Sequence, residues 1–217
     1  MSAVQKNKKG INQMSEKETV NTDDYVTPER ASNATSTWNI DPAHSAAQFN
    51  VRHMMISNVK GDFSKIIGRL ELDETDINNS RVETLIDAST IRTREPQRDA
   101  HLKSADFLDV EKFPTLAFKS THISQRREGE LAVTGDLTVH GVTRKVVLDV
   151  QGPSVPMKDP WGAMRIGLSA TTHINRKDFG LTWNSLLESG GFLVDDDVFI
   201  TLDVEFVKNG DSGSLSR

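Results

Sequence analysis

The segment LAVTGDLTVHGVTRKVVLDV, residues 131–150, alternates apolar and polar side chains on either side of a short central turn. Successive side chains of a β-strand point to opposite faces, so a two-residue period predicts a strand with one buried face. The apolar positions are Leu131, Val133, Leu137 and Val139 in the first half, and Val146, Leu148 and Val150 in the second. Joined by HGVT, residues 140–143, the two runs predict an antiparallel hairpin.

The same period recurs through most of the chain. It is clear in AAQFNVRH (46–53), MRIGLSATTHI (164–174) and VFITLDVEF (198–206), and further strands are expected near 37–41, 59–72, 82–89 and 115–124. Together these segments give about nine strands. Asp41-Pro42 predicts a turn between the first two strands. Phe63 and Ile66 differ in parity, which indicates a bulge or bend in the strand at 59–72.

Helix signals are few. Pro96 stands near the start of EPQRDAHLKSADFLD (95–109), and TWNSLLES (182–189) predicts a second short helix or a turn. Serial strands with one helical excursion indicate an all-β antiparallel sandwich or barrel, and periodicity alone does not choose between them. Eight strands closed into a barrel would leave an interior for one small ligand and no exposed sheet edge.

Composition sets the domain limits. Residues 1–36 and 209–217 are polar and lack a period, so they are expected to be disordered tails around one domain at 37–208. The formal net charge of −5 argues against nucleic acid as a partner, and the absence of cysteine excludes disulfides and thiol chemistry. No secretory h-region or spanning apolar run is evident, so a cytoplasmic location is expected.

Signals for catalysis or metal binding are weak. The six histidines are scattered without an HExxH motif, and no G-x-S-x-G elbow or phosphate-binding glycine loop is present. The run Asp195-Asp196-Asp197 lacks the spacing of a calcium loop and reads better as a turn. We therefore predict no catalytic residue and no metal site. Aromatic residues gather between the strands and either plug a core or line an apolar cavity: Phe107, Phe113, Phe118, Phe179, Trp183 and Phe192.

Four segments, in order, resemble the YceI-like family, the bacterial polyisoprenoid-binding proteins. They are WNIDPAHSAAQFNVRHMMISNVKGDF, RDAHLKSADFLDVEKFPTLAFKS, GDLTVHGVTRKVVLDV and RIGLSATTHINRKDFGL, and the resemblance covers residues 38 to about 207. It implies an eight-stranded antiparallel lipocalin-like β-barrel with one or two short helices near its mouth. It also implies an internal apolar tunnel for a long chain, such as a polyprenyl pyrophosphate, a quinone or a fatty-chain lipid. Many family members are periplasmic and carry a signal peptide, which is not evident here.

The leading hypothesis is a soluble protein that sequesters or carries such a lipid and requires no cofactor. The expected partners are the hydrophobic lipid, a second copy of the chain in a homodimer and, during lipid exchange, a membrane surface. Strand-face parity and position in the family segments select the tunnel lining: Phe49, Val51, His53, Phe63, Ile86, His101, Phe107, Phe118, Leu137, Leu148, Leu168, Phe179 and Trp183. A charged headgroup is expected at the mouth, where the candidates to hold it are Arg52, Arg98, His101, Lys103, Arg165 and Arg176.

Two alternatives remain open at this point. One is an enzyme acting on an isoprenoid lipid with His53 or His101 as general base. The other is a stress-response or interaction protein whose cavity is filled by its own side chains. His44 is expected to bond the Asp41-Pro42 turn, whereas His53 is either a satisfied interior histidine or a polar contact at one end of the cavity.

Overall fold

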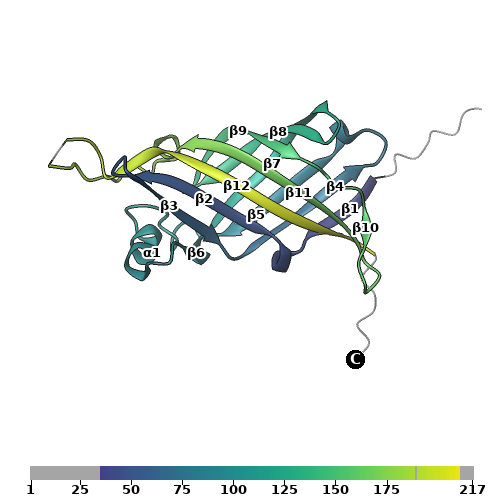
Figure 1. Ribbon diagram of the computed structural model, residues 1–217, viewed down its shortest axis with the longest axis horizontal. Helices are drawn as coiled ribbons and strands as arrows, with labels where there is room; N and C mark the ends of the chain where they lie inside the picture. Colours follow the sequence, from purple (N-terminus) through teal and green to yellow (C-terminus); the bar gives the residue numbers. More distant parts are fainter. Residues whose placement is uncertain (1–34, 189, 211–217) are drawn as a thin grey trace, which may run out of the picture. The chain divides into compact units, whose positions relative to one another are not determined.

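The computed structural model describes residues 35–188 and 190–210. The strands in this part of the chain form one sheet that curves round and closes on itself (Figure 1). The expected tails lie outside these residues, except that the first strand already begins at Thr35 and that residues 209–210 are described as a turn. The strands are β1 (Thr35–Ile40), β2 (Ala46–His53), β3 (Ser57–Phe63), β4 (Ile66–Asp73), β5 (Arg81–Asp87), β6 (Ile91–Arg92), β7 (Thr115–Arg127), β8 (Glu130–Val139), β9 (Val142–Gln151), β10 (Met157–Lys158), β11 (Met164–Asn175) and β12 (Val194–Lys208).

Three strands of the barrel are each interrupted once. β1 and β2 both pair antiparallel with β12, so they are halves of a single strand. β3 and β4 continue one another along β2 and β1, and β6 and β5 do the same along β3 and β4. With β7, β8, β9, β11 and β12 this makes an eight-stranded closed antiparallel barrel, in which β12 closes onto the first strand. The predicted fold class is confirmed.

Local side-chain bonds build the interruptions between β1 and β2 and between β5 and β6, and the same motif recurs between β4 and β5 and after β11. Short 3-10 helices η1 (Pro42–His44), η2 (Ile77–Asn79), η3 (Ala88–Thr90) and η4 (Arg176–Phe179) each follow an Asp or Asn whose side chain accepts a backbone N–H two residues on. The turn predicted at Asp41-Pro42 is therefore a kink within one strand and not a reversal between two strands. The bend predicted between Phe63 and Ile66 is confirmed at the break between β3 and β4.

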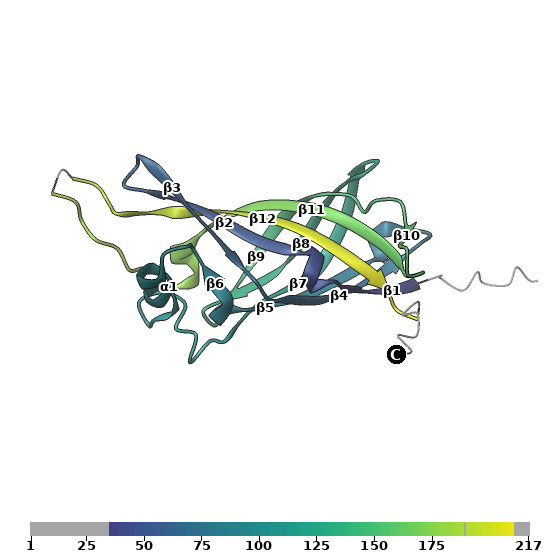
Figure 2. The ribbon, with the colours of Figure 1, turned by 60° about the horizontal axis from the view of Figure 1, so that its bottom comes forward.

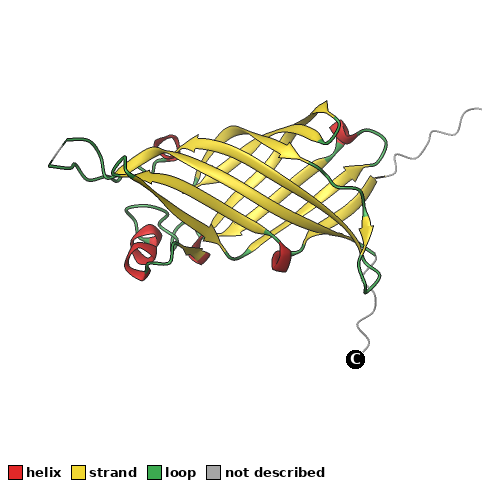
Figure 3. Cartoon of the chain, in the orientation of Figure 1, coloured by secondary structure: helices red, strands yellow, loops and turns green. Residues whose placement is uncertain are grey.

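The α-helix α1 (Pro96–Lys103) stands at one end of the barrel (Figure 3). It starts at Pro96 as predicted, and the Glu95 carboxylate caps it by accepting from the amides of Gln97 and Arg98. For 182–189, where a short helix or a turn was predicted, the described residues form no helix, and Glu188 lies in a turn. Residues 181–188 and 190–193 belong to a loop, called the loop 181–193 below. The Asn184 side chain bonds both the N–H and the carbonyl of Val194, and Gly190 and Gly191 reverse the chain at positive φ.

The barrel end opposite α1 is packed with large side chains. Trp38, Ile166 and Phe206 are almost completely buried there, and the Trp38 indole N–H donates to the Ser36 hydroxyl at 2.8 Å. Burial of a large apolar side chain contributes about 1.5–3 kcal/mol, so this cluster stabilises that end of the barrel. The cavity described below is therefore bounded by densely packed side chains at the end of the barrel opposite α1.

Gly135 in β8 gives the Phe118 ring the space it occupies across the sheet. A Cβ at position 135 would lie 2.4 Å from the Phe118 ring and 2.5 Å from the Lys119 carbonyl oxygen. Gly135→Ala is expected to destabilise the barrel by about 1–3 kcal/mol, because the backbone oxygen cannot move aside. Urea unfolding measures the effect. Gly167→Ala is the matched strand control, since the nearest atom there is 3.9 Å away, and an equal loss in both variants would contradict the steric argument.

Candidate functional site: an apolar cavity inside the barrel

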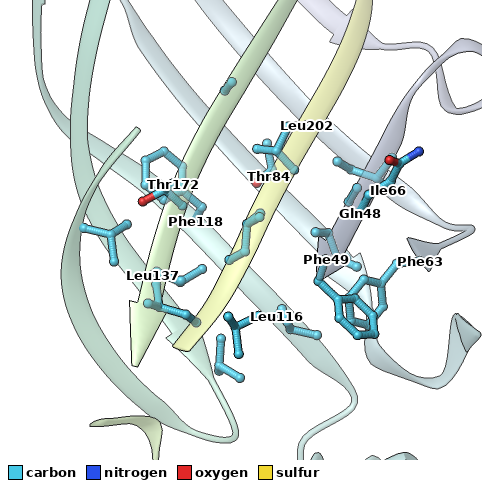
Figure 4. A pocket seen from close by; sticks show the side chains of 18 of the residues that line it. Gln48, Phe49, Phe63, Ile66, Thr84, Leu116, Phe118, Leu137, Thr172 and Leu202 are labelled. Atoms are coloured by element: carbon cyan, nitrogen blue, oxygen red, sulfur yellow. The ribbon is translucent and has the colours of Figure 1, made fainter. Parts of the chain in front are cut away.

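A cavity of about 660 Å³ lies inside the barrel, and side chains from all eight barrel strands line it. This volume is within the 300–1,000 Å³ range that is usual for small-molecule sites. Figure 4 shows Phe49, Phe118, Leu137 and Leu202, which belong to β2, β7, β8 and β12, around the same space. Aliphatic and aromatic carbons dominate the wall.

The two-residue period explains which side chains face the cavity. All the apolar positions of the segment 131–150 line it, as do Phe49, Val51 and His53 of β2. Residues that were not selected from the sequence have the same parity as the lining residues on their strands, among them Leu116, Val146, Val198 and Ile200. Parity alone could have found these four. Ile123 has the opposite parity to Phe118 and still borders the cavity, because the register of β7 shifts between Ser120 and His122. Gln48 and Arg52, which alternate with Phe49, Val51 and His53 along β2, also border the cavity.

The residues selected from the sequence for the tunnel lining all border the cavity, with the exception of Phe179. Phe179 is 1 % exposed and packs with Ile91, Leu108 and Val139 in a core cluster. It lies on η4, where Gly180 in the left-handed conformation ends the helix. Its aromatic ring is therefore a structural plug. Whether the other residues contact a ligand stays a prediction.

Polar groups gather at the α1 end of the cavity. Arg52, His53, Glu95, Gln97, Arg98 and His101 border it there. The His101 ring packs edge-on against Phe107 and Trp183, with centroids 5.1 and 4.6 Å apart, and its Nε2 lies 2.9 Å from an Asp106 carboxylate oxygen. This end, the mouth of the cavity, combines an aromatic rim with groups that can hold a polar headgroup.

Arg176 was a headgroup candidate, but its guanidinium is already occupied by the protein. It is 3 % exposed and donates to the carbonyl oxygens of Leu181, Trp183, Val194 and Asp195 and to the Asp196 carboxylate. Burial lowers the pKa of Arg176 from its usual value, and the neighbouring carboxylates partly oppose that effect. Arg176 fixes the loop 181–193 and is not available for a ligand.

Arg165, another headgroup candidate, lies at the opposite end of the barrel from the mouth. Its guanidinium bonds the carboxylates of Asp41, Asp159 and Glu205, and it does not border the cavity. Lys103 does not border the cavity either. Four of the six headgroup candidates border the cavity: Arg52, Arg98, His101 and Arg176. Because the guanidinium of Arg176 is bonded to the protein, Arg52, Arg98 and His101 remain as groups that can hold a headgroup.

The ion pairs between Arg165 and its carboxylate partners should make the free energy of unfolding depend on pH. Burial alone would raise the pKa of Asp41, but hydrogen bonds from Arg165, His44 and the Ala43 amide outweigh it and lower the pKa to about 2. A lowered folded-state pKa contributes stability that is full above pH 3.8, the ordinary value, and is lost as the pH falls towards 2. We expect the urea midpoint to drop across this range, with a smaller drop in Asp41→Asn. Parallel curves for the two proteins would contradict this.

Among residues 35–188 and 190–210, one group of three side chains has the geometry to hold a metal ion: Asp41, His44 and Glu205. The Arg165 guanidinium already bonds both of these carboxylates, so a cation there would face a fixed positive charge. His44 Nδ1 lies 2.9 Å from the Asp41 carboxylate, which confirms the expected bond to the turn. His53, by contrast, borders the cavity from the end of β2.

Fold and cavity together define a class of protein: a closed antiparallel β-barrel with an enclosed apolar site. The model of the YceI-like domain matches residues 38–206. A UPF0312 protein of Vibrio cholerae is 38 % identical over 139 residues, which are 64 % of this chain and 73 % of the relative. The chain belongs to the YceI-like family.

Solved structures share the barrel. The YceI protein of Campylobacter jejuni matches with a TM-score of 0.62 and 28 % identity, over 72 % of this chain and 88 % of that one. A structure described as a polyisoprenoid binding domain from Saccharophagus degradans matches with a TM-score of 0.57 and 13 % identity, over 79 % of this chain and 98 % of the other. At that identity the second match shows the fold alone. In the described part of the chain, no helix has the length and apolar character needed to span a membrane.

Proposed function

We propose that the barrel binds one lipid with a single long apolar chain, of isoprenoid or fatty type, and sequesters or carries it. The observation that carries the proposal is the 660 Å³ cavity walled by inward-facing carbon side chains. The description of the Saccharophagus degradans domain as polyisoprenoid-binding supports the isoprenoid class. In this proposal the protein binds the lipid without a cofactor.

The cavity volume limits the length of the chain. If each heavy atom takes up about 30 Å³, as a water molecule does, the cavity holds about 20 of them. A chain of about 15–20 carbons would fit inside, and a longer polyprenyl chain would have to extend through the mouth. The hypothesis of an interior filled by the protein's own side chains does not fit this volume.

Burial of the lipid chain is sufficient to supply the binding affinity. Each enclosed methylene contributes about 0.8 kcal/mol, so fifteen give an upper limit of about 12 kcal/mol. Lost translational and conformational freedom offsets several kcal/mol of this. Micromolar to nanomolar binding follows. A charged pyrophosphate or carboxylate would be costly among the apolar side chains, so it belongs at the mouth beside Arg98 and His101.

Native mass spectrometry of the protein purified from cells, followed by lipid extraction, tests the proposal. We expect a co-purifying lipid whose chain is near 20 carbons. Delipidated protein should then bind prenyl alcohols, quinones and fatty acids with an affinity that rises with chain length up to about that size and then levels off. A consistently empty protein that binds none of these ligands would show that the proposal is wrong.

A further inference from the structure

The turn between β2 and β3 contains residue types that are unusual for its backbone conformation. Met54 and Met55 occupy its two central positions with φ of 51° and 63°, and the Ile56 amide donates to the His53 carbonyl at 3.1 Å. Because His53 pairs with Ser57, the connection has three residues, 54–56. Two consecutive positive φ values strongly favour Asn and Gly, because other side chains are strained there. The β8–β9 turn follows that preference with Gly141 at its second position. Met54 and Met55 are 38 % and 64 % exposed, so burial in the barrel core does not account for their presence in this turn.

These methionines belong to a larger exposed apolar surface. Met55 is 64 % exposed and Ile56 is 75 % exposed on this turn, while Leu186 is 76 % exposed on the loop 181–193. Phe192 on the same loop is also exposed. We call Met54, Met55, Ile56, Leu186 and Phe192 the apolar tips. Exposed apolar side chains that gather at one end of a protein mark a surface that contacts a partner or a membrane.

The two segments that carry the apolar tips are joined to each other. The Met54 amide donates to the Leu193 carbonyl at 2.9 Å, and His53 pairs with Val194 across the ladder. In both ribbon views the β2–β3 turn and the loop 181–193 extend from the same end of the barrel as α1 (Figure 2). The tips can therefore insert into one surface together.

The apolar tips are continuous with the cavity. His53, Leu193 and Val194, which directly adjoin the tips, border it, as does Trp183 on the same loop. A lipid that leaves a bilayer between the tips would enter the cavity without passing through water. The apolar chain that stabilises the bound lipid also opposes its release into water, so a carrier gains from direct contact with the membrane.

Charge around the tips does not favour a purely electrostatic contact. Arg52 donates to the Met55 carbonyl, and Lys177 lies over the Phe192 ring. Acidic residues of the same region, Glu188 and Asp195–Asp197, oppose them. Insertion of apolar side chains between lipid headgroups, which does not need an anionic membrane, fits this balance better.

We propose that the apolar tips insert into a lipid bilayer and hold the mouth of the cavity against it during lipid transfer. This inference rests on the proposed lipid-binding function and adds the partner and the surface that contacts it. We assign the apolar tips to a bilayer and not to a second copy of the chain. The reason is that the cavity opens beside the tips and fits a lipid, which is supplied by a bilayer.

The test is flotation of the full chain with vesicles of phosphatidylcholine, alone or with phosphatidylglycerol. The double substitution Met54→Asn with Met55→Gly installs the favoured turn residues, so folding should be kept or improved. Vesicle binding should nevertheless fall about tenfold or more, because two inserted side chains are lost. Phe192→Ser should lower it independently, and the unchanged protein should bind both kinds of vesicle similarly.

Met157→Ser with Trp161→Ser is the matched control, since these exposed apolar residues lie at the opposite end of the barrel from α1. It should leave vesicle binding unchanged. An equal loss in the control, or no binding by the unchanged protein, would overturn the inference. A dimer that the tip substitutions dissociate, without vesicle binding, would overturn it as well.

Ligand titration in vesicle-free solution separates the two proposals. The Met54→Asn, Met55→Gly protein should still bind a short soluble prenyl alcohol as the unchanged protein does. If vesicles are not bound but the alcohol is, only the membrane inference fails. If vesicles are bound but no lipid enters the cavity, the proposed function fails.

Discussion

The substitution Leu202→Trp is expected to abolish binding of the longest chains and to leave the barrel folded. Leu202 points into the cavity from β12 (Figure 4), and its neighbours across the ladders are Ala47 and Ala170, both small and both bordering the cavity. An indole at this position therefore extends into open space and does not collide with the adjacent strands. Its roughly six additional heavy atoms displace about as many carbons of a bound chain.

The size of the effect follows from the displaced carbons. At about 0.8 kcal/mol per methylene, the loss of five or six enclosed groups costs about 4–5 kcal/mol, which is about a thousandfold in affinity. Ligands five or six carbons shorter should bind nearly as they do to the unchanged protein. Fluorescence titration with a homologous series of prenyl alcohols measures the shift in the optimal chain length.

Thr201→Trp is the matched control, because Thr201 directly precedes Leu202 on β12 and is exposed on the outer face. It should leave the chain-length profile unchanged. If Leu202→Trp binds the longest chains normally, the ligand does not occupy the middle of the barrel. If both substitutions weaken binding equally, the effect comes from distortion of β12.

The alternation of apolar side chains was sufficient to predict most of the fold and most of the cavity wall. In the segment 131–150 the same positions that suggested a half-buried hairpin face the cavity in the structure. This succeeds because the direction of a strand side chain depends on local backbone geometry alone. The family resemblance supplied the choice of a closed barrel over a sandwich, which periodicity leaves open.

The errors occur where the structure depends on contacts between distant residues. Asp41-Pro42 signals a local change of direction, but only pairing of β1 and β2 with the same strand shows that the chain continues along its path. Phe179 has the chemistry of a lining residue, and its burial depends on how η4 packs among other elements. Arg165 and Arg176 were selected as free cations, because sequence spacing does not reveal carbonyl or carboxylate partners that are far along the chain.

Replacing Arg176 by methionine is expected to cause the largest loss of stability. Arg176→Met keeps most of the aliphatic volume but removes donors to four backbone carbonyls and to Asp196. Breaking a buried charged interaction on one side typically costs about 3–5 kcal/mol, because the remaining polar groups stay desolvated without partners. Urea unfolding measures the loss, and amide hydrogen exchange should show the earliest opening in residues 181–195.

The neighbouring Lys177 provides the control that separates burial from charge. Lys177 Nζ pairs with the same Asp196 carboxylate at 2.8 Å, but its side chain is 43 % exposed. Lys177→Met should therefore cost about 0–1 kcal/mol, an effect that salt screens, whereas the loss in Arg176→Met should persist at high salt. Because Arg176 holds the carbonyl of Trp183 at the mouth, its removal should also weaken lipid binding. Equal losses in the two variants would show that the buried carbonyl contacts do not stabilise the loop.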